Sequence, residues 1–146
     1  MLRGNQTAKI DDKGRLKIPN AFRALIEQQH GTGLYVTSLT GVSMRVYPMA
    51  EWLALEQRLA RVPSINPART RFLDRVNYFG EVTEFDVQGR VLIPSRLRET
   101  AGMAGDVDVL GQVSFLEVWN HDRFLEKLAR EPFTDDDARQ LAEFGI

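Results

Sequence analysis

A segment of nine residues occurs twice in this chain of 146 residues, and this internal repeat restricts the possible folds more than any other feature. Residues 11–19 and 86–94 align at an offset of 75, with identical Asp, Gly, Arg, Ile and Pro at equivalent positions. A second similarity, between 45–53 and 117–125, follows at an offset of 72. The sequence therefore predicts a duplicated half of about 70 residues.

Each copy of the repeat is predicted to begin as a tight turn that leads into a short strand. Asp11 and Asp86 can accept hydrogen bonds from their own backbone, and Gly14 and Gly89 can adopt the positive φ of the last turn position. Polar and apolar residues alternate over 15–18, which is typical of a half-buried strand. We therefore interpret the four turn residues as structural.

The segments that follow are predicted to form matching helices and hairpins. Asn20 and Ser95 are expected to N-cap short helices over roughly 21–29 and 96–101, with a glycine just beyond each end. Antiparallel hairpins are expected where two strand-like runs flank a turn, namely 34–38 with 44–47 and 107–110 with 115–119. Together these elements predict an α+β fold with a mainly β core and flanking helices.

Longer helices and a linker complete the predicted organisation. Pro48 is expected to open an amphipathic helix whose apolar face comprises Trp52, Leu55, Leu59 and Val62. A second helix is expected across 68–79, and a third is expected to begin at Thr134. The predicted divisions are a first half (1–62), a linker with a helix (63–79), a second half (80–131) and a C-terminal helical tail (132–146).

The net charge of −1 conceals an uneven distribution of charge along the chain. Residues 1–98 carry 15 Lys and Arg against 9 Asp and Glu, whereas residues 99–146 carry 4 against 11. A local basic patch can bind an anionic partner whatever the total charge, because screening limits fields to about 10 Å. The same distribution also fits a solvated surface without a partner, so composition alone leaves both interpretations open.

Residues suited to catalysis are few, and we do not expect an enzyme. His30 and His121 lie far apart in the sequence and near no nucleophile signature, so both are interpreted as helix-end or surface residues. Cysteine is absent, which excludes thiolate chemistry and disulfides and suits a reducing cytoplasm. The aspartates 135–137 fit the first turn of a helix better than a cation site. No metal, cofactor, small-molecule substrate or membrane partner is expected.

The strongest candidate for a binding site is a cluster of cations on the first copy of the motif. Lys13 lies on the turn, and Arg15 and Lys17 share one side of the strand by its two-residue period. Phosphates would supply affinity, and an arginine can donate two hydrogen bonds to guanine. The structural alternative is that the arginine only pairs with a carboxylate across the turn. Candidate DNA-binding residues are Arg15, Lys13, Lys17, Arg3, Lys9 and Arg90.

The duplicated motif resembles that of the MraZ family, whose domains belong to the SpoVT/AbrB swapped-hairpin superfamily. The similarity rests on Asp11 to Arg15 and Asp86 to Arg90, and it extends to residues 3–5, 47–52 and 66–67. It covers essentially residues 1–130. The resemblance implies a swapped-hairpin β-barrel in which two AbrB-like halves form a pseudo-dimer within one chain.

The same resemblance implies a function in transcription. It suggests a regulator, usually a repressor, of a division and cell-wall gene cluster that binds tandem promoter repeats as a ring of subunits and associates with the nucleoid. The motif arginine tied to DNA contact corresponds to Arg15, with Arg90 as its counterpart. Because the sequence neighbours of Arg90, Gln88 and Leu92, are uncharged, we expect Arg90 to matter less. An antitoxin-like or protein-interaction module is the alternative, supported by the acidic C-terminal third.

Overall fold

The computed structural model describes all of residues 1–146 and confirms the α+β class. Strands and helices follow one another in the order β1 (Leu2–Ile10), β2 (Arg15–Lys17), α1 (Asn20–His30), β3 (Gly33–Thr37), β4 (Met44–Pro48), α2 (Met49–Leu59), α3 (Pro67–Tyr78), β5 (Glu81–Glu84), β6 (Arg90–Leu92), α4 (Ser95–Thr100), β7 (Gly105–Val113), β8 (Leu116–Asn120), α5 (His121–Arg130) and α6 (Asp135–Ala142). Both predicted hairpins, β3–β4 and β7–β8, are present.

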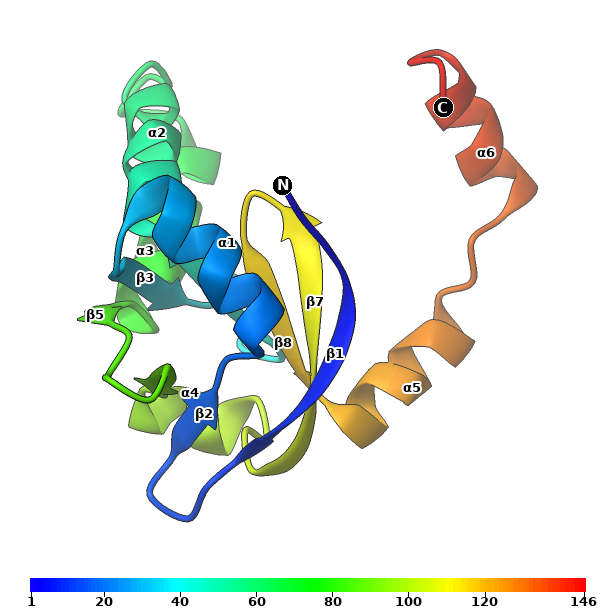
Figure 1. Ribbon diagram of the computed structural model, residues 1–146. Coiled ribbons are helices and arrows are strands. Elements are labelled where there is room, and N and C mark those ends of the chain that lie inside the picture. The colour runs from blue at the N-terminus through cyan, green and yellow to red at the C-terminus, as the bar shows by residue number, and fades with distance from the viewer.

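All the strands belong to one antiparallel sheet, which curls into a nearly closed barrel (Figure 1). Their order is β5-β3-β4-β8-β7-β1-β2-β6, so strands that are distant in the sequence become neighbours in space. The hairpins of the two repeats meet at β4 and β8, where Val46 lies opposite Leu116. At the end of the strand order, the two motif strands β2 and β6 pair with each other.

The two repeats exchange their first strands. β1 pairs along its whole length with β7 of the second repeat, from Leu2 opposite Val113 to Ile10 opposite Gly105. In return, β5 of the second repeat pairs with β3 of the first. The predicted pseudo-dimer of swapped hairpins is therefore confirmed. The division at 62, 79 and 131 remains a prediction, because strands of both repeats share one sheet.

A single large apolar core fills the barrel. It combines equivalent side chains of both repeats: Leu16 and Val91 from the motif strands and Ile18 and Ile93 from the segments after them are all fully buried. A smaller aromatic cluster lies under α2, where Trp52 stacks on Tyr35 with ring centroids 4.4 Å apart. Burial of such side chains is the main stabilising contribution, at roughly 1.5–3 kcal/mol each.

Helices α1 and α4 begin differently from the prediction. Asn20 and Ser95 are the first residues of these helices, and prolines 19 and 94 occupy the cap positions without any side-chain cap hydrogen bond. The carbonyl of Pro19 accepts from the backbone N–H groups of Phe22 and Arg23. The predicted caps were wrong because each helix begins one residue earlier than expected, directly after an extended proline with φ of −53° and ψ of 136°.

The remaining helices largely follow the predicted pattern. α2 ends at Leu59, so Val62 lies beyond the helix that was expected to include it. The Asn66 side chain caps α3, and Thr134 with Asp137 forms a capping box at the start of α6. In Figure 1, α6 stands apart from the barrel. None of the helices is long and apolar enough to cross a membrane.

Candidate nucleic-acid interface

Strands β2 and β6, which carry the two copies of the motif, form a short antiparallel ribbon. Their register pairs three residues of each strand: Arg15 with Leu92, Leu16 with Val91, and Lys17 with Arg90. The middle pair is fully buried in the core. Because side chains alternate along a strand, the two outer pairs share the opposite, outer face. We call Arg15, Lys17, Arg90 and Leu92 the ribbon face.

The first motif turn is held together by the side chain of Asp11. Its Oδ1 atom accepts from the backbone N–H groups of Lys13 at 3.0 Å and Arg15 at 2.9 Å. The backbone N–H of Gly14 donates to the carbonyl of Asp11, and Gly14 has a φ of +79°. The backbone hydrogen bond from Arg15 is the main cause that lowers the pKa of Asp11, so this carboxylate stays charged at neutral pH.

The second motif turn repeats this geometry. The Oδ1 atom of Asp86 accepts from the backbone N–H groups of Gln88 at 2.9 Å and Arg90 at 2.8 Å, and Gly89 has a φ of +77°. The N–H of Arg90 likewise lowers the pKa of Asp86. The two turns are therefore structural equivalents, even though their second and third residues differ chemically.

Each turn carboxylate also orients the motif arginine of the same turn. The Nε atom of Arg15 donates to Asp11 Oδ2 at 2.8 Å, and Nε of Arg90 donates to Asp86 Oδ2 at 2.9 Å. Only Nε is used in each pair, so both terminal amino groups of each guanidinium remain able to donate to a ligand. The pairing with a carboxylate and a binding role are therefore compatible rather than exclusive.

Cross-strand pairing gives the second motif turn a neighbouring lysine, as the first turn has in Lys13. Lys17 of the first repeat lies beside Arg90, and its Nζ donates to the carbonyl of Gln88 at 2.6 Å. One end of the ribbon thus carries Arg15 and Lys13, and the other carries Arg90 and Lys17. The premise that Arg90 lacks charged neighbours holds in the sequence only, because its cross-strand partner Lys17 comes from the other repeat.

Two arginines that were not among the candidate residues brace the turns from the opposite repeat. Arg98 of α4 lies against Gly14, and Arg23 of α1 lies against Gly89. Nε of Arg23 pairs with Glu27 at 3.0 Å, whereas Nε of Arg98 is buried without a partner. The sequence could have indicated the equivalence of these two arginines, because Arg23 and Arg98 align at the same offset of 75 as the motif.

The other predicted cations lie away from the ribbon face or at its margin. Arg3 is exposed near the start of β1, and roughly 20–25 Å of strand separates it from the motif turn. Lys9 is exposed near the other end of β1, where its Nζ lies 3.9 Å from Asp106. The structure therefore brings Lys13, Arg15, Lys17 and Arg90 together, and it does not bring Arg3 to them.

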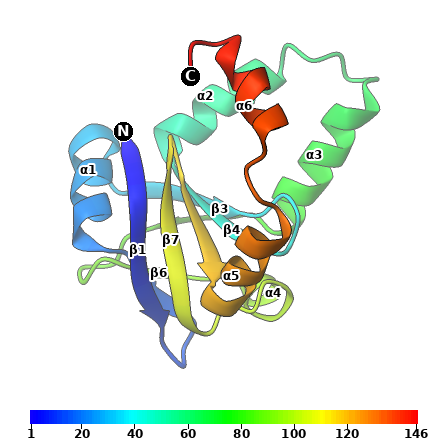
Figure 2. The ribbon, with the colours of Figure 1, turned by 90° about the vertical axis from the view of Figure 1, so that its right-hand side faces the viewer.

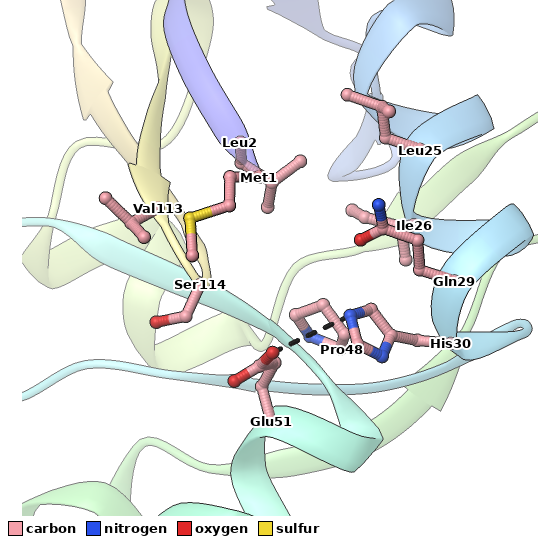
Figure 3. Close-up of a pocket in the computed structure, with 10 residues that line it drawn as sticks. All are labelled: Met1, Leu2, Leu25, Ile26, Gln29, His30, Pro48, Glu51, Val113 and Ser114. Carbon is pink, nitrogen blue, oxygen red and sulfur yellow. Dashed lines mark ion pairs between the residues drawn. The ribbon is translucent and has the colours of Figure 1, made fainter.

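The two histidines lie outside the ribbon. His30 ends α1 and lines a pocket with Leu25, Pro48 and other residues, where its ring faces Glu51 at 3.7 Å (Figure 3). His121 was expected to be a simple surface residue, but its Nδ1 lies 2.7 Å from the buried carboxylate of Asp108. The hydrogen bond to Asp108 raises the pKa of His121.

The fold and the ribbon define the class of protein: a single chain in which two hairpin repeats exchange strands and join their motif strands in one cationic ribbon. The chain belongs to the MraZ family. The family described as "MraZ protein, putative antitoxin-like" matches residues 1–75 and 81–144. These two matched segments contain the two copies of the motif.

Full-length relatives support this assignment. The protein named "Transcriptional regulator MraZ" of Acidobacterium capsulatum is 48% identical over 146 residues, covering all of both chains. The protein of the same name from Koribacter versatilis is 45% identical over 147 residues, again covering all of both chains. That of Corynebacterium jeikeium is 34% identical over 146 residues and 99% of each chain.

Proposed function

We propose that this protein is a DNA-binding transcriptional regulator whose ribbon face enters the major groove. The observation that carries the proposal is the ribbon itself, on whose outer face Lys17 is exposed and Arg15 and Arg90 are partly exposed. The name of the relatives, transcriptional regulator, supports the same class of function.

The dimensions and chemistry of the ribbon suit the major groove. That groove is about 12 Å wide and admits a two-stranded β-ribbon. Cross-strand diagonal neighbours are about 7–8 Å apart, so Arg15 and Arg90 can reach base edges of one short site together. Each arginine can donate two hydrogen bonds to a guanine through its two terminal amino groups, while its Nε remains bonded to its aspartate.

Phosphate contacts supply the remaining affinity in this proposal. Lys13 on the first turn and Lys17 beside the second turn flank the two arginines, where each can neutralise a backbone phosphate. The acidic residues of the chain are concentrated in 99–146. A net charge of −1 is therefore compatible with DNA binding, since exposed charges beyond a Debye length are screened.

Membership of the MraZ family motivates the finer features of the proposal. We propose that the protein represses a division and cell-wall gene cluster from tandem promoter repeats, as a ring of subunits associated with the nucleoid. A single ribbon with four cations is expected to bind one short site weakly at physiological salt. Several subunits on adjacent repeats would overcome this weakness.

Single substitutions on the ribbon test the proposal. Binding to duplex DNA from upstream of the protein's own gene is measured by gel shift at several salt concentrations. Arg15→Ala and Arg90→Ala should each weaken binding by about 1–3 kcal/mol and relax preference at one base position. Lys17→Ala should weaken binding to all sequences and reduce the salt slope by about one.

The control is Arg130→Ala, which removes an exposed arginine from the end of α5. It should leave the affinity and the salt slope unchanged. Because the ribbon gives Arg90 the neighbour Lys17, we now expect losses of similar size for both arginines. Operator affinity that survives Arg15→Ala and Arg90→Ala together, in a folded protein, would refute the site.

A protein-interaction module remains the second candidate. The family description contains the words "antitoxin-like", and the exposed residues 131–146 are acidic. A full-length protein that binds neither promoter fragments nor heparin would favour this alternative over DNA binding.

A further inference from the structure

The segment Glu131–Ile146 extends from the barrel without packing against it. The hydrogen bonds of residues 132–146 stay within the segment, and its helix α6 is eight residues long. Figures 1 and 2 both show α6 beyond the end of α5, with no strand beside it. Large apolar side chains of the segment are exposed, with Phe133 at 71%, Phe144 at 78% and Ile146 at 81%.

Such a segment needs a partner to stay helical. Isolated helices shorter than about 12–15 residues are marginal in water. The capping box of Thr134 and Asp137 favours the start of α6, but it contributes only about 1 kcal/mol. Leu141, which is half-buried, and the exposed Phe144 lie three residues apart and offer an apolar side.

A complementary surface lies between α2 and α3. Leu55, Leu59, Val62 and Phe72 line an open apolar groove there, together with Arg58. The groove is shallow and does not belong to the main core. We call it the α2–α3 groove.

The charges around the groove are opposite to those of the segment. Residues 57–75 carry five basic side chains against the single acidic Asp74, and the basic ones are Arg58, Arg61, Arg69, Arg71 and Arg75. None of these arginines forms an ion pair within the chain. Nε of Arg69 is buried without a hydrogen-bond partner.

The segment 131–146 carries five acidic side chains against the single basic Arg139. Asp135 and Glu143 form no ion pair within the chain. The groove region and the segment therefore match in both respects: apolar side chains at the centre and net charges of +4 and −4 around them.

We propose that the segment 131–146 of one copy docks into the α2–α3 groove of a second copy. In Figure 1, α6 lies on the opposite side of the barrel from α2 and α3, and only residues 131–134 connect α5 to α6. Docking between copies lets the segment extend as it does here. This inference gives the self-association of the proposed function a specific interface, and it is tested without DNA so that the two stand or fall separately.

The proposed contact is head-to-tail, because the segment and the groove are different surfaces. Each copy then uses its groove for one neighbour and its segment for another. Such contacts generate a closed ring when the rotation between subunits closes, and a filament when it does not. Phe144 and Leu141 would lie against Leu59 and Phe72, with Asp135 and Glu143 facing the arginines.

Two complementary variants test the contact by sedimentation velocity. Phe144→Asp removes an exposed apolar residue of the segment, and the double variant Arg58→Glu with Arg71→Glu reverses exposed charges at the groove. The unmodified protein should sediment as an assembly. Each variant alone should sediment at the mass of one chain, 16.6 kDa.

Mixing the two variants gives the decisive readout. The groove is intact in Phe144→Asp, and the segment is intact in the arginine variant, so the mixture retains one good interface. It should form a one-to-one complex of twice the 16.6 kDa chain mass and nothing larger. The complex also proves that both variants are folded. The matched control Leu53→Asp changes an exposed leucine of α2 outside the groove and should leave assembly unchanged.

Several results would overturn the proposal. A wild-type protein that stays monomeric at high concentration would do so, as would variants that assemble like the wild type. A mixture that remains monomeric would show that the segment of one copy does not bind the groove of another.

Discussion

Gly14 and Gly89 adopt φ values of +79° and +77°, which side chains with a Cβ rarely accept. A Cβ at Gly14 would lie 2.5 Å from Nη1 of Arg98, and one at Gly89 would lie 2.8 Å from the side chain of Arg23. We expect Gly14→Val and Gly89→Val each to lower the free energy of unfolding by about 1 kcal/mol or more, measured by urea titration.

Gly4 separates the two causes of this destabilisation. Its φ is +89°, but a Cβ there would have no neighbour within 4 Å. Gly4→Val should therefore show only the backbone cost. Unchanged stability in Gly14→Val would contradict the turn, and equal losses at all three positions would mean that the arginines move aside freely.

The pair of His121 and Asp108 makes stability depend on pH. The hydrogen bond to Asp108 holds the pKa of His121 above its ordinary value of about 6.5 in the folded state. The stabilisation is then complete below pH 6.5 and is lost as the pH rises through the higher folded pKa. Unfolding of the wild type and His121→Gln, followed between pH 5.5 and 9, should give curves that converge as the pH rises.

The matching control for this pH dependence is Asp108→Asn, which keeps the shape of the side chain but removes its charge. In the Asp108→Asn background, adding His121→Gln should change the pH dependence of the free energy of unfolding only slightly. A constant difference between wild type and His121→Gln over the whole range would show that the pair contributes no proton-linked stability.

Helix starts in this protein are set in two different ways. The side chain of Asn120 accepts from the backbone N–H of Arg123 at the start of α5, and it donates to the carbonyl of Gly102 at 2.9 Å. Asn120→Ala should therefore lower the free energy of unfolding by about 1 kcal/mol. Ser95→Ala should change it by a few tenths at most, because Ser95 is the first residue of α4 and the cap position is Pro94, which makes no side-chain cap hydrogen bond. Comparable losses in the two variants, measured by chemical denaturation, would contradict this distinction.

Most elements could be predicted from the sequence because their signals are local. Alternating polar and apolar residues predicted β2, and the Asp and Gly residues predicted the motif turns. Thr134 predicted the start of α6. The two caps were mispredicted because a proline followed by a polar residue fits two different helix starts. The exchange of β1 and β5 leaves no local signal, so it was available only through the resemblance of the whole chain to a family.

The candidate interface also depends on contacts between residues that are distant in the sequence, which local signals do not predict. The sequence singled out Arg15, Lys17 and Arg90 as candidates, but it presented them as one strong cluster and one weak one. The register of β2 and β6 joins them on one face, because the exchange of strands brings residues 75 positions apart into contact. Sequence neighbours alone cannot reveal a cross-strand neighbour such as Lys17 for Arg90.

Strand exchange also determines how many ribbons each chain can present to DNA in the proposed function. Each chain presents only one ribbon, because β2 and β6 of the two repeats are used together. In the proposed function, one chain would therefore cover one short DNA site, and high affinity would require several chains. If the chains assemble through 131–146 and the α2–α3 groove, each assembly holds several ribbons in fixed relative positions.

We expect such an assembly to require tandem sites in helical register. Once one ribbon is bound, the next meets its repeat at high effective concentration, so affinity should rise by about 10²–10⁴ from one repeat to two or three. Inserting about five base pairs, half a turn of B-DNA, should remove the gain because the second site then faces away. Gel shifts with one, two and three repeats measure the effect, and Phe144→Asp should bind all three probes like a single site. A monomer that binds one repeat as tightly as three would refute this dependence on assembly.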